Sequence, residues 1–69
     1  MLDEKARELI AVGAAVTANC IPCLKYHAGK AREAGADAEE VRQAVAVGKT
    51  VRKGSAGEFD EAAAAVVQE

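Results

Sequence analysis

Alanine fills 17 of the 69 positions in this chain, and no other feature restricts its fold as strongly. Alanine has the highest intrinsic helix propensity, and Glu, Lys, Arg and Gln, which are also good helix formers, occupy most polar positions. β-Branched and aromatic residues nowhere alternate with the period of two that a half-buried strand requires. We therefore predict an all-α fold, organised as a single domain over residues 1–69.

The apolar part of the sequence is too small for a large core. Apart from alanine and cysteine, only 16 apolar side chains remain. A chain of this size buries only about 60% of the surface that its unfolded form exposes, and such domains usually need a disulfide, a metal or a partner subunit. We therefore expect a homo-oligomer.

Capping residues and glycines predict a four-helix unit. The first helix begins near Asp3, a good N-cap, and runs to about Ala18. The second has Pro22 in its first turn, where a missing N–H is no loss, and runs to about Ala34. Gly35 then supplies the left-handed residue that ends it.

The third and fourth helices are predicted from two capping patterns. Asp37 with Glu40 resembles a capping box and starts the third helix, which Gly54 closes. Ser55 with Glu58 repeats the S-x-x-E pattern and starts the fourth. The fourth helix carries an apolar stripe formed by Phe59, Ala62, Ala63, Val66 and Val67. Three basic residues are interpreted as a favourable charge cluster in the last turn of the third helix, namely Lys49, Arg52 and Lys53.

Gly13 stands in the middle of the first helix. Glycine in a helix interior costs about 1 kcal/mol relative to alanine. We therefore predict that Gly13 serves the close approach of a neighbouring backbone.

Charge and hydropathy exclude two classes of function. Nine Lys and Arg against 11 Asp and Glu give a net charge of −2 without a basic block, which argues against nucleic acid as the main partner. No apolar run approaches the roughly 20 residues that cross a bilayer, and no charged leader precedes a short apolar stretch. We expect a soluble, cytoplasmic protein without a membrane partner.

The chemistry of the chain is concentrated between Cys20 and His27. In the cytoplasm, a pair of cysteines so close together rarely acts as a structural staple, which leaves redox chemistry or metal binding. Cys20 lies in the cap region of the second helix and Cys23 in its first turn, where free N–H groups and the helix dipole favour a thiolate. The spacing also lets the two sulfurs meet. His27 follows Cys23 by one turn, so its imidazole is placed to take the thiol proton directly or through one water.

Two other interpretations of this segment stay open. Cys20, Cys23 and His27 could bind a metal, although a structural zinc site needs a fourth ligand, from another subunit or from water. The same residues could instead pack in a purely structural oligomeric protein. Haem attachment is disfavoured because it needs His directly after the second cysteine, where Leu24 stands. We expect no cofactor.

Glu8, at the edge of the apolar stripe of the first helix, is a fourth candidate. Glu8 lies about 16 Å of axial rise from Asn19, whereas Cys23 and His27 are separated by about 6 Å. In a plain antiparallel hairpin Glu8 would overshoot His27. A steep helix crossing, a bridging water or a neighbouring subunit would then be needed to bring it to the site.

Together, Glu8, Cys20, Cys23 and His27 form the pattern E-x11-C-x-x-C-x-x-x-H, followed by a glycine turn and a capped helix. Over roughly residues 2–54 the chain closely resembles the alkylhydroperoxidase D-like core of the carboxymuconolactone decarboxylase family. The resemblance implies an all-helical dimer, trimer or hexamer and a thiol-disulfide oxidoreductase that reduces peroxides with an external dithiol. It also implies that Cys23 is the peroxide-reactive sulfur, Cys20 its disulfide partner, and His27 with Glu8 the proton relay.

The chain departs from the family in ways that bear on activity. The best-studied branch has a second His directly before the second cysteine, where this chain has Pro22, which weakens the expectation of strong peroxidase activity. The decarboxylase branch lacks the cysteine pair, so lactone decarboxylation is not expected. The chain is also shorter than the two-repeat enzymes, which implies that two copies pair to rebuild the larger unit.

Overall fold

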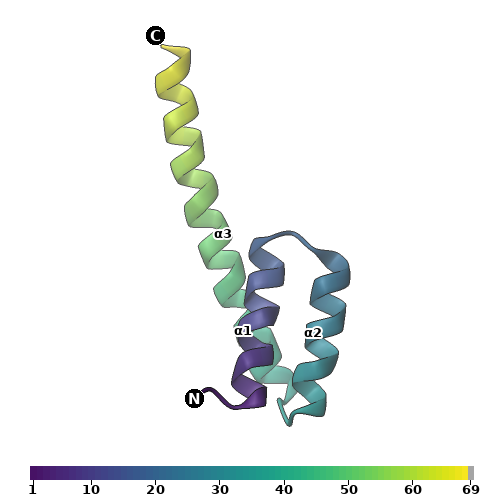
Figure 1. The fold of residues 1–69 in the computed structure, drawn as a ribbon. Helices are drawn as coiled ribbons and strands as arrows, with labels where there is room; N and C mark the ends of the chain where they lie inside the picture. The colour runs from purple at the N-terminus through teal and green to yellow at the C-terminus, as the bar shows by residue number, and fades with distance from the viewer. Residues whose placement is uncertain (69) are drawn as a thin grey trace.

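The computed structural model describes residues 1–68 and contains three helices, α1 (Glu4–Thr17), α2 (Ile21–Glu33) and α3 (Ala38–Val67) (Figure 1). No strand occurs in these residues, which confirms the all-α prediction. α1 and α2 form an antiparallel hairpin, and the first half of α3 packs on α1 (Figure 1). The second half of α3 projects beyond the hairpin, so the molecule is elongated, with extents of 52 × 23 × 21 Å.

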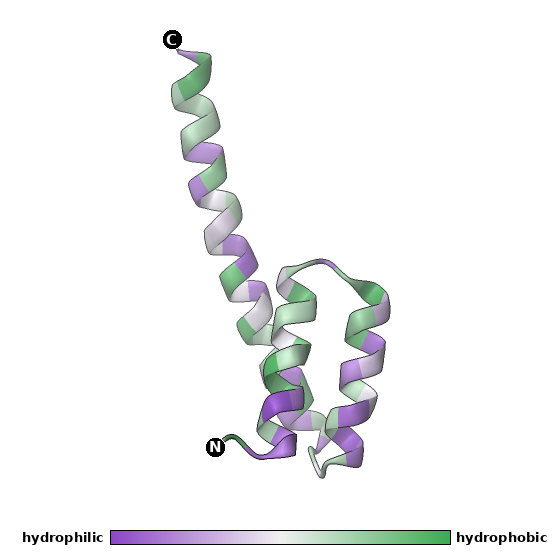
Figure 2. Ribbon diagram, in the orientation of Figure 1, coloured by the Kyte–Doolittle hydropathy of each residue, from purple (hydrophilic) through white to green (hydrophobic). Residues whose placement is uncertain are grey.

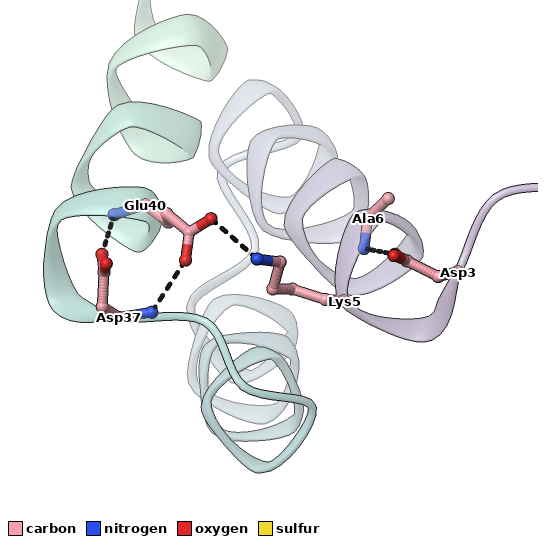
Figure 3. Close-up of polar contacts among 5 residues, drawn as sticks. All are labelled: Asp3, Lys5, Ala6, Asp37 and Glu40. Carbon is pink, nitrogen blue, oxygen red and sulfur yellow. Dashed lines mark hydrogen bonds and ion pairs between the residues drawn. The ribbon is translucent and has the colours of Figure 1, made fainter.

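Side-chain caps fix the starts of α1 and α3 where the sequence predicts them (Figure 3). Asp3 accepts a hydrogen bond of 2.8 Å from the backbone N–H of Ala6. Asp37 accepts from the backbone N–H of Glu40 at 2.8 Å, and Glu40 accepts from that of Asp37 at 3.0 Å, so the capping box is complete. The other carboxylate oxygen of Glu40 bonds Lys5 Nζ at 3.0 Å and ties the start of α3 to α1.

Each turn between helices depends on one residue with a left-handed backbone. These residues are Asn19, with a φ of 57°, and Gly35, with a φ of 102°. After α1, the N–H of Asn19 donates to the carbonyl of Val16 and that of Cys20 to the carbonyl of Ala15, which is the Schellman pattern. The same pattern follows α2, as the position of Gly35 predicts. The chain therefore reverses over residues 18–20 and again over residues 34–37.

The third and fourth predicted helices are one continuous helix, α3, so the prediction of four helices is wrong. A C-terminal glycine ends a helix by adopting a positive φ, and Gly54 does not adopt one. The pattern from Ser55 to Glu58 therefore lies inside α3 rather than at a helix start. The apolar stripe remains in phase across this junction, because Val51, Ser55 and Phe59 follow one another at intervals of four residues.

The core is small and consists of valines and alanines. Its buried members are Val12, Ala15, Val16, Ala28, Ala31, Ala36 and Val41. Within residues 1–68, Val12 is the only larger side chain that is completely buried, and Leu9 and Leu24 are among the partly buried residues that pack around it. α1 contributes three of these seven residues, the largest share of any helix, and lies against both other helices, whereas α2 and α3 touch each other little.

α1 and α3 approach each other most closely at Gly13 and Gly48, as the position of Gly13 predicts. A Cβ added to Gly48 would lie 2.5 Å from the carbonyl oxygen of Gly13 and 2.8 Å from Cβ of Val16. The Thr17 hydroxyl oxygen lies 3.0 Å from the carbonyl oxygen of Gly13 and 3.2 Å from that of Gly48. The two glycines thus allow a backbone contact that holds α3 on α1.

The projecting half of α3 carries hydrophobic residues that no other part of the described chain covers (Figure 2). Phe59 is 71% exposed, and Val66 and Val67 are 64% and 85% exposed. Within residues 1–68, no helix combines the length and the hydropathy needed to cross a membrane.

Candidate functional site

Cys20 and Cys23 form a disulfide at the N-terminus of α2. Cys20 is the N-cap, with φ −101° and ψ 99°, and its sulfur accepts a hydrogen bond of 3.3 Å from the backbone N–H of Cys23. Pro22 occupies a position in the first turn where the helix loses no hydrogen bond. These positions confirm that the pair opens the second helix and that its sulfurs meet. When reduced, both sulfurs lie where free N–H groups favour a negative charge.

The two cysteines differ in accessibility. Cys23 is exposed, whereas Cys20 is half-buried at the end of the turn from α1. An incoming molecule therefore reaches Cys23 more easily, and Cys20 lies closer to the protein interior.

His27 lies one turn after Cys23 and is held by a carboxylate from α1. Its Nδ1 lies 2.7 Å from Oε2 of Glu8, and the two side chains are 31% and 21% exposed. The protein thus shields much of this pair from water. With a proton on Nδ1 shared with Glu8, Nε2 is the nitrogen left to accept a proton from another group.

His27 and the two cysteines share a shallow hollow, which we call the Cys23 hollow. Its volume is about 260 Å³, and it is lined by Ala11, Ala14, Ala15, Ala18, Cys20, Cys23 and His27. The alanines all lie on α1 or in the turn that follows it, and their small side chains leave room beside the sulfurs. A small molecule in this hollow would contact both sulfurs and the imidazole.

The direct contact of Glu8 with His27 differs from the predicted overshoot. Measured from the helix ends, Glu8 lies about 13.5 Å of axial rise before the end of α1, and His27 lies about 9 Å after the start of α2. Counting the rise to His27 from Cys23 instead of from the start of α2 makes the difference between the two axial rises too large. The remaining offset is about 4.5 Å, which corresponds to three residues at 1.5 Å per residue. The two side chains bridge this offset.

Sequence reasoning missed the place of Arg52. Because α3 continues beyond Gly54, the basic cluster lies in the middle of a helix and not in its last turn. Arg52 donates hydrogen bonds to the carbonyl oxygen of Val16 at 3.2 Å and to Oδ1 of Asn19 at 2.9 Å. Its guanidinium thus stabilises the turn that carries Cys20. Helical periodicity placed Arg52 on α3, but no local signal pairs it with Asn19.

The described residues give no direct support to a metal site. Within residues 1–68, no three His, Cys, Asp or Glu side chains converge closely enough to hold a metal ion. Both candidate sulfur ligands are bonded to each other, so a metal would first require reduction of the disulfide.

The carboxymuconolactone decarboxylase family matches residues 1–69. A curated relative from Paracoccus denitrificans, "Uncharacterized protein 4 in cox locus", is 35% identical over 68 residues, which cover 99% of this chain and 61% of the relative. The chain thus spans less than two thirds of that relative's length. No solved structure matches the chain. The chain belongs to the carboxymuconolactone decarboxylase family.

Proposed function

We propose that this protein is a thiol-disulfide oxidoreductase that reduces peroxides, as the alkylhydroperoxidase D-like members of its family do. The observation that carries the proposal is the exposed Cys23, bonded to Cys20 at a helix N-terminus, beside an imidazole that a carboxylate holds. Such a pair combines a stabilised thiolate, a resolving thiol and a group that moves protons.

The first half of the reaction oxidises the cysteine pair. His27 takes the proton of the Cys23 thiol, and the thiolate attacks the nearer oxygen of the peroxide. The O–O bond breaks, Cys23 becomes a sulfenic acid, and the imidazolium returns its proton to the leaving oxygen, which departs as alcohol or water. The Cys20 thiol then attacks the sulfur of Cys23, which forms the disulfide and releases water.

The second half reduces the disulfide again. An external dithiol transfers two electrons and two protons, which restores both thiols and leaves the donor as a disulfide. The best-studied branch of the family has a further His where this chain has Pro22. In this chain, proton transfer therefore depends on His27 and Glu8 alone. We therefore expect slow peroxide turnover and faster thiol-disulfide exchange.

A titration of the thiols under anaerobic conditions tests the proposal. Protein reduced by a dithiol should show two free thiols, lose both with one equivalent of peroxide, and regain both with fresh dithiol. The proposal fails if the two cysteines do not form a reversible disulfide. Stoichiometric zinc in protein purified without chelator, with both thiols protected by it, would instead favour the metal-binding alternative.

We also propose that the protein is a homo-oligomer in which copies exchange the projecting half of α3. A groove of about 430 Å³ between α1 and α3 is lined almost entirely by apolar groups, among which Ile10, Val47 and Val51 are each more than half exposed. The projecting half carries the uncovered Phe59 and Val66. The same chain thus has both an unfilled apolar groove and an apolar helix without a partner, and a two-fold exchange between copies would cover both.

A further inference from the structure

A second hollow lies beside Cys20, and we call it the Cys20 hollow. Its volume is about 280 Å³, and all three helices contribute to its lining. Its apolar lining residues are Ala15, Val16, Ile21, Leu24 and Val45, and its other lining residues are Cys20, Asn19, Lys49 and Arg52. Cys20 borders both this hollow and the Cys23 hollow, whereas Cys23 and His27 line only the latter.

The charged residues of the Cys20 hollow are both cations. In the described part of the chain, no carboxylate lies within salt-bridge distance of Lys49 or Arg52. The hydrogen bonds of Arg52 go from one terminal nitrogen to neutral oxygens, which fix the guanidinium in place without compensating its charge. Its other donors remain available for the two-pronged contact that guanidinium makes with a carboxylate.

The position of Cys20 decides which reactant would use this hollow. A thiolate that attacks the sulfur of Cys20 expels Cys23 as the leaving group. Cys23 leaves as a thiolate in the first turn of α2, near His27, where its charge is stabilised, and a more stable leaving thiolate leaves faster. Attack on Cys20 from its own hollow thus expels a stabilised thiolate and regenerates Cys23 in its reduced form.

We propose that the Cys20 hollow is the entry site of the electron donor, and that it selects a thiol borne on an apolar chain that ends in a carboxylate. This inference deepens the proposed function and rests on it. The apolar lining contacts the apolar chain of the donor, and Arg52 and Lys49 bind its carboxylate. The donor thiolate then forms a mixed disulfide with Cys20, and Cys23 is released as a thiolate. A second thiol, on the same or another donor molecule, then resolves the mixed disulfide, so that two thiols become one disulfide and the protein gains two thiols.

The test compares mercaptohexanoate with mercaptohexanol, which share the apolar chain and end in a carboxylate and a neutral hydroxyl group. Reduction of the oxidised protein is followed through the release of its thiols, with dithiothreitol as a small neutral reference. After correction for the reactivity of each thiol toward a small disulfide, mercaptohexanoate should react about fivefold faster than mercaptohexanol, the upper range for an exposed ion pair. Early in the reaction, peptide mass spectrometry should find the mixed disulfide on Cys20.

Two variants and a competitor decide the outcome. Lys49→Gln should reduce the preference for the carboxylate and leave the rate with dithiothreitol unchanged, and Arg52→Gln should also reduce the preference. Because Arg52 also braces a turn, Lys49→Gln keeps the test valid if Arg52→Gln unfolds. Hexanoate should slow reduction by mercaptohexanoate but not by dithiothreitol. Equal rates for the two chains, or a preference that survives both substitutions, would overturn the proposal.

This experiment is independent of peroxide reduction. It begins with the disulfide and measures only its reduction, so a protein that never reduces peroxides can still show the predicted preference. The opposite outcome is also distinguishable. If peroxide oxidises the two thiols and dithiothreitol restores them, but mercaptohexanoate is not preferred, the oxidoreductase proposal stands and the proposal of a donor site is refuted.

Discussion

Nδ1 of His27 and Oε2 of Glu8 lie 2.7 Å apart, although the two residues belong to different helices. This contact fixes the orientation of the imidazole one turn after Cys23. It also defines which ring nitrogen is free, because the carboxylate engages Nδ1 and leaves Nε2 for a partner in the Cys23 hollow. The carboxylate thus holds the ring in one orientation, as in other sites where an acid orients a histidine.

The first prediction concerns this pair. His27→Gln should lower the rate of peroxide reduction by about 10² or more, the usual range for loss of a general acid-base group. Glu8→Gln should have a smaller effect, because its side chain can still form a hydrogen bond that orients the imidazole. Stopped-flow measurement of disulfide formation after mixing with peroxide gives both rates.

Glu33→Gln is the matched control for Glu8→Gln. Glu33 is 72% exposed at the end of α2, and its contact with Lys30 is long, at 3.9 Å. This control should react like the unaltered protein. Equal rates for Glu8→Gln and Glu33→Gln would show that the contact with His27 plays no part in proton transfer.

The second prediction separates the roles of the two cysteines. Cys23→Ser should abolish peroxide consumption, because the exposed sulfur that attacks is gone. Cys20→Ser should still consume one equivalent and then stop as a sulfenic acid, which dimedone traps on Cys23 for mass spectrometry. If the sulfenic acid instead appears on Cys20 in the Cys23→Ser protein, the two roles are reversed.

Local sequence signals predicted the helix boundaries on both sides of the cysteine pair. The cap at Asp3, the capping box of Asp37 and the left-handed Gly35 all occupy their predicted places, because each depends on residues only a few positions apart. For the same reason Pro22 correctly located the start of the helix that holds both sulfurs.

Relations between distant residues were not predictable in this way. The contact between Glu8 and His27 depends on how tightly the chain reverses at Asn19, which composition and periodicity do not determine. The continuity of α3 depends on the backbone conformation of Gly54, since glycine is compatible with both a helix interior and a helix end. Arg52 reaches the turn only because α3 crosses α1 there.

The third prediction concerns the contact between α1 and α3. Gly48→Ala should destabilise the protein, because its Cβ would lie 2.5 Å from the carbonyl oxygen of Gly13. Overpacking of this kind costs about 1–3 kcal/mol, and the gain in helix propensity offsets about 1 kcal/mol of it. Gly29→Ala is the control, since a Cβ there meets no atom within 4 Å, and it should raise the thermal midpoint. Thermal unfolding followed by circular dichroism compares the two, and equal midpoints would contradict the close contact.

The fourth prediction concerns pH. The backbone hydrogen bond from Asp37 and the bond from Lys5 hold the pKa of Glu40 below its ordinary value of 4.5. The same bond raises the pKa of Lys5 above its ordinary value of 10.5. The contribution of Glu40 to stability is therefore present above pH 4.5 and is lost as the pH falls through its lowered pKa. That of Lys5 is present below pH 10.5 and is lost as the pH rises through its raised pKa.

Glu40→Gln tests this dependence, because glutamine can still accept the hydrogen bond of the capping box but carries no charge. Urea unfolding of this variant should depend less on pH on the acid side than that of the unaltered protein. The effect should also shrink with added salt, since both side chains are exposed to solvent. Glu58→Gln, on the projecting half of α3, should keep the original pH dependence. If the stability of Glu40→Gln depends on pH on the acid side as strongly as that of the unaltered protein, the ion pair does not contribute to folding.

The fifth prediction concerns self-association through the projecting half of α3. If this half fills the apolar groove of another copy, a charge at Phe59 must be buried there without a partner, which is unfavourable. Phe59→Glu should therefore lower the molar mass in light scattering to that of one chain. Ala64→Glu adds the same charge on another face of the helix, about 140° away from Phe59 at 100° per residue, and should leave the assembly intact. A single chain at micromolar concentration for the unaltered protein, or equal dissociation of both variants, would contradict the exchange of this helix. Because the groove also includes Gly48, Gly48→Ala should weaken the assembly as well as the fold.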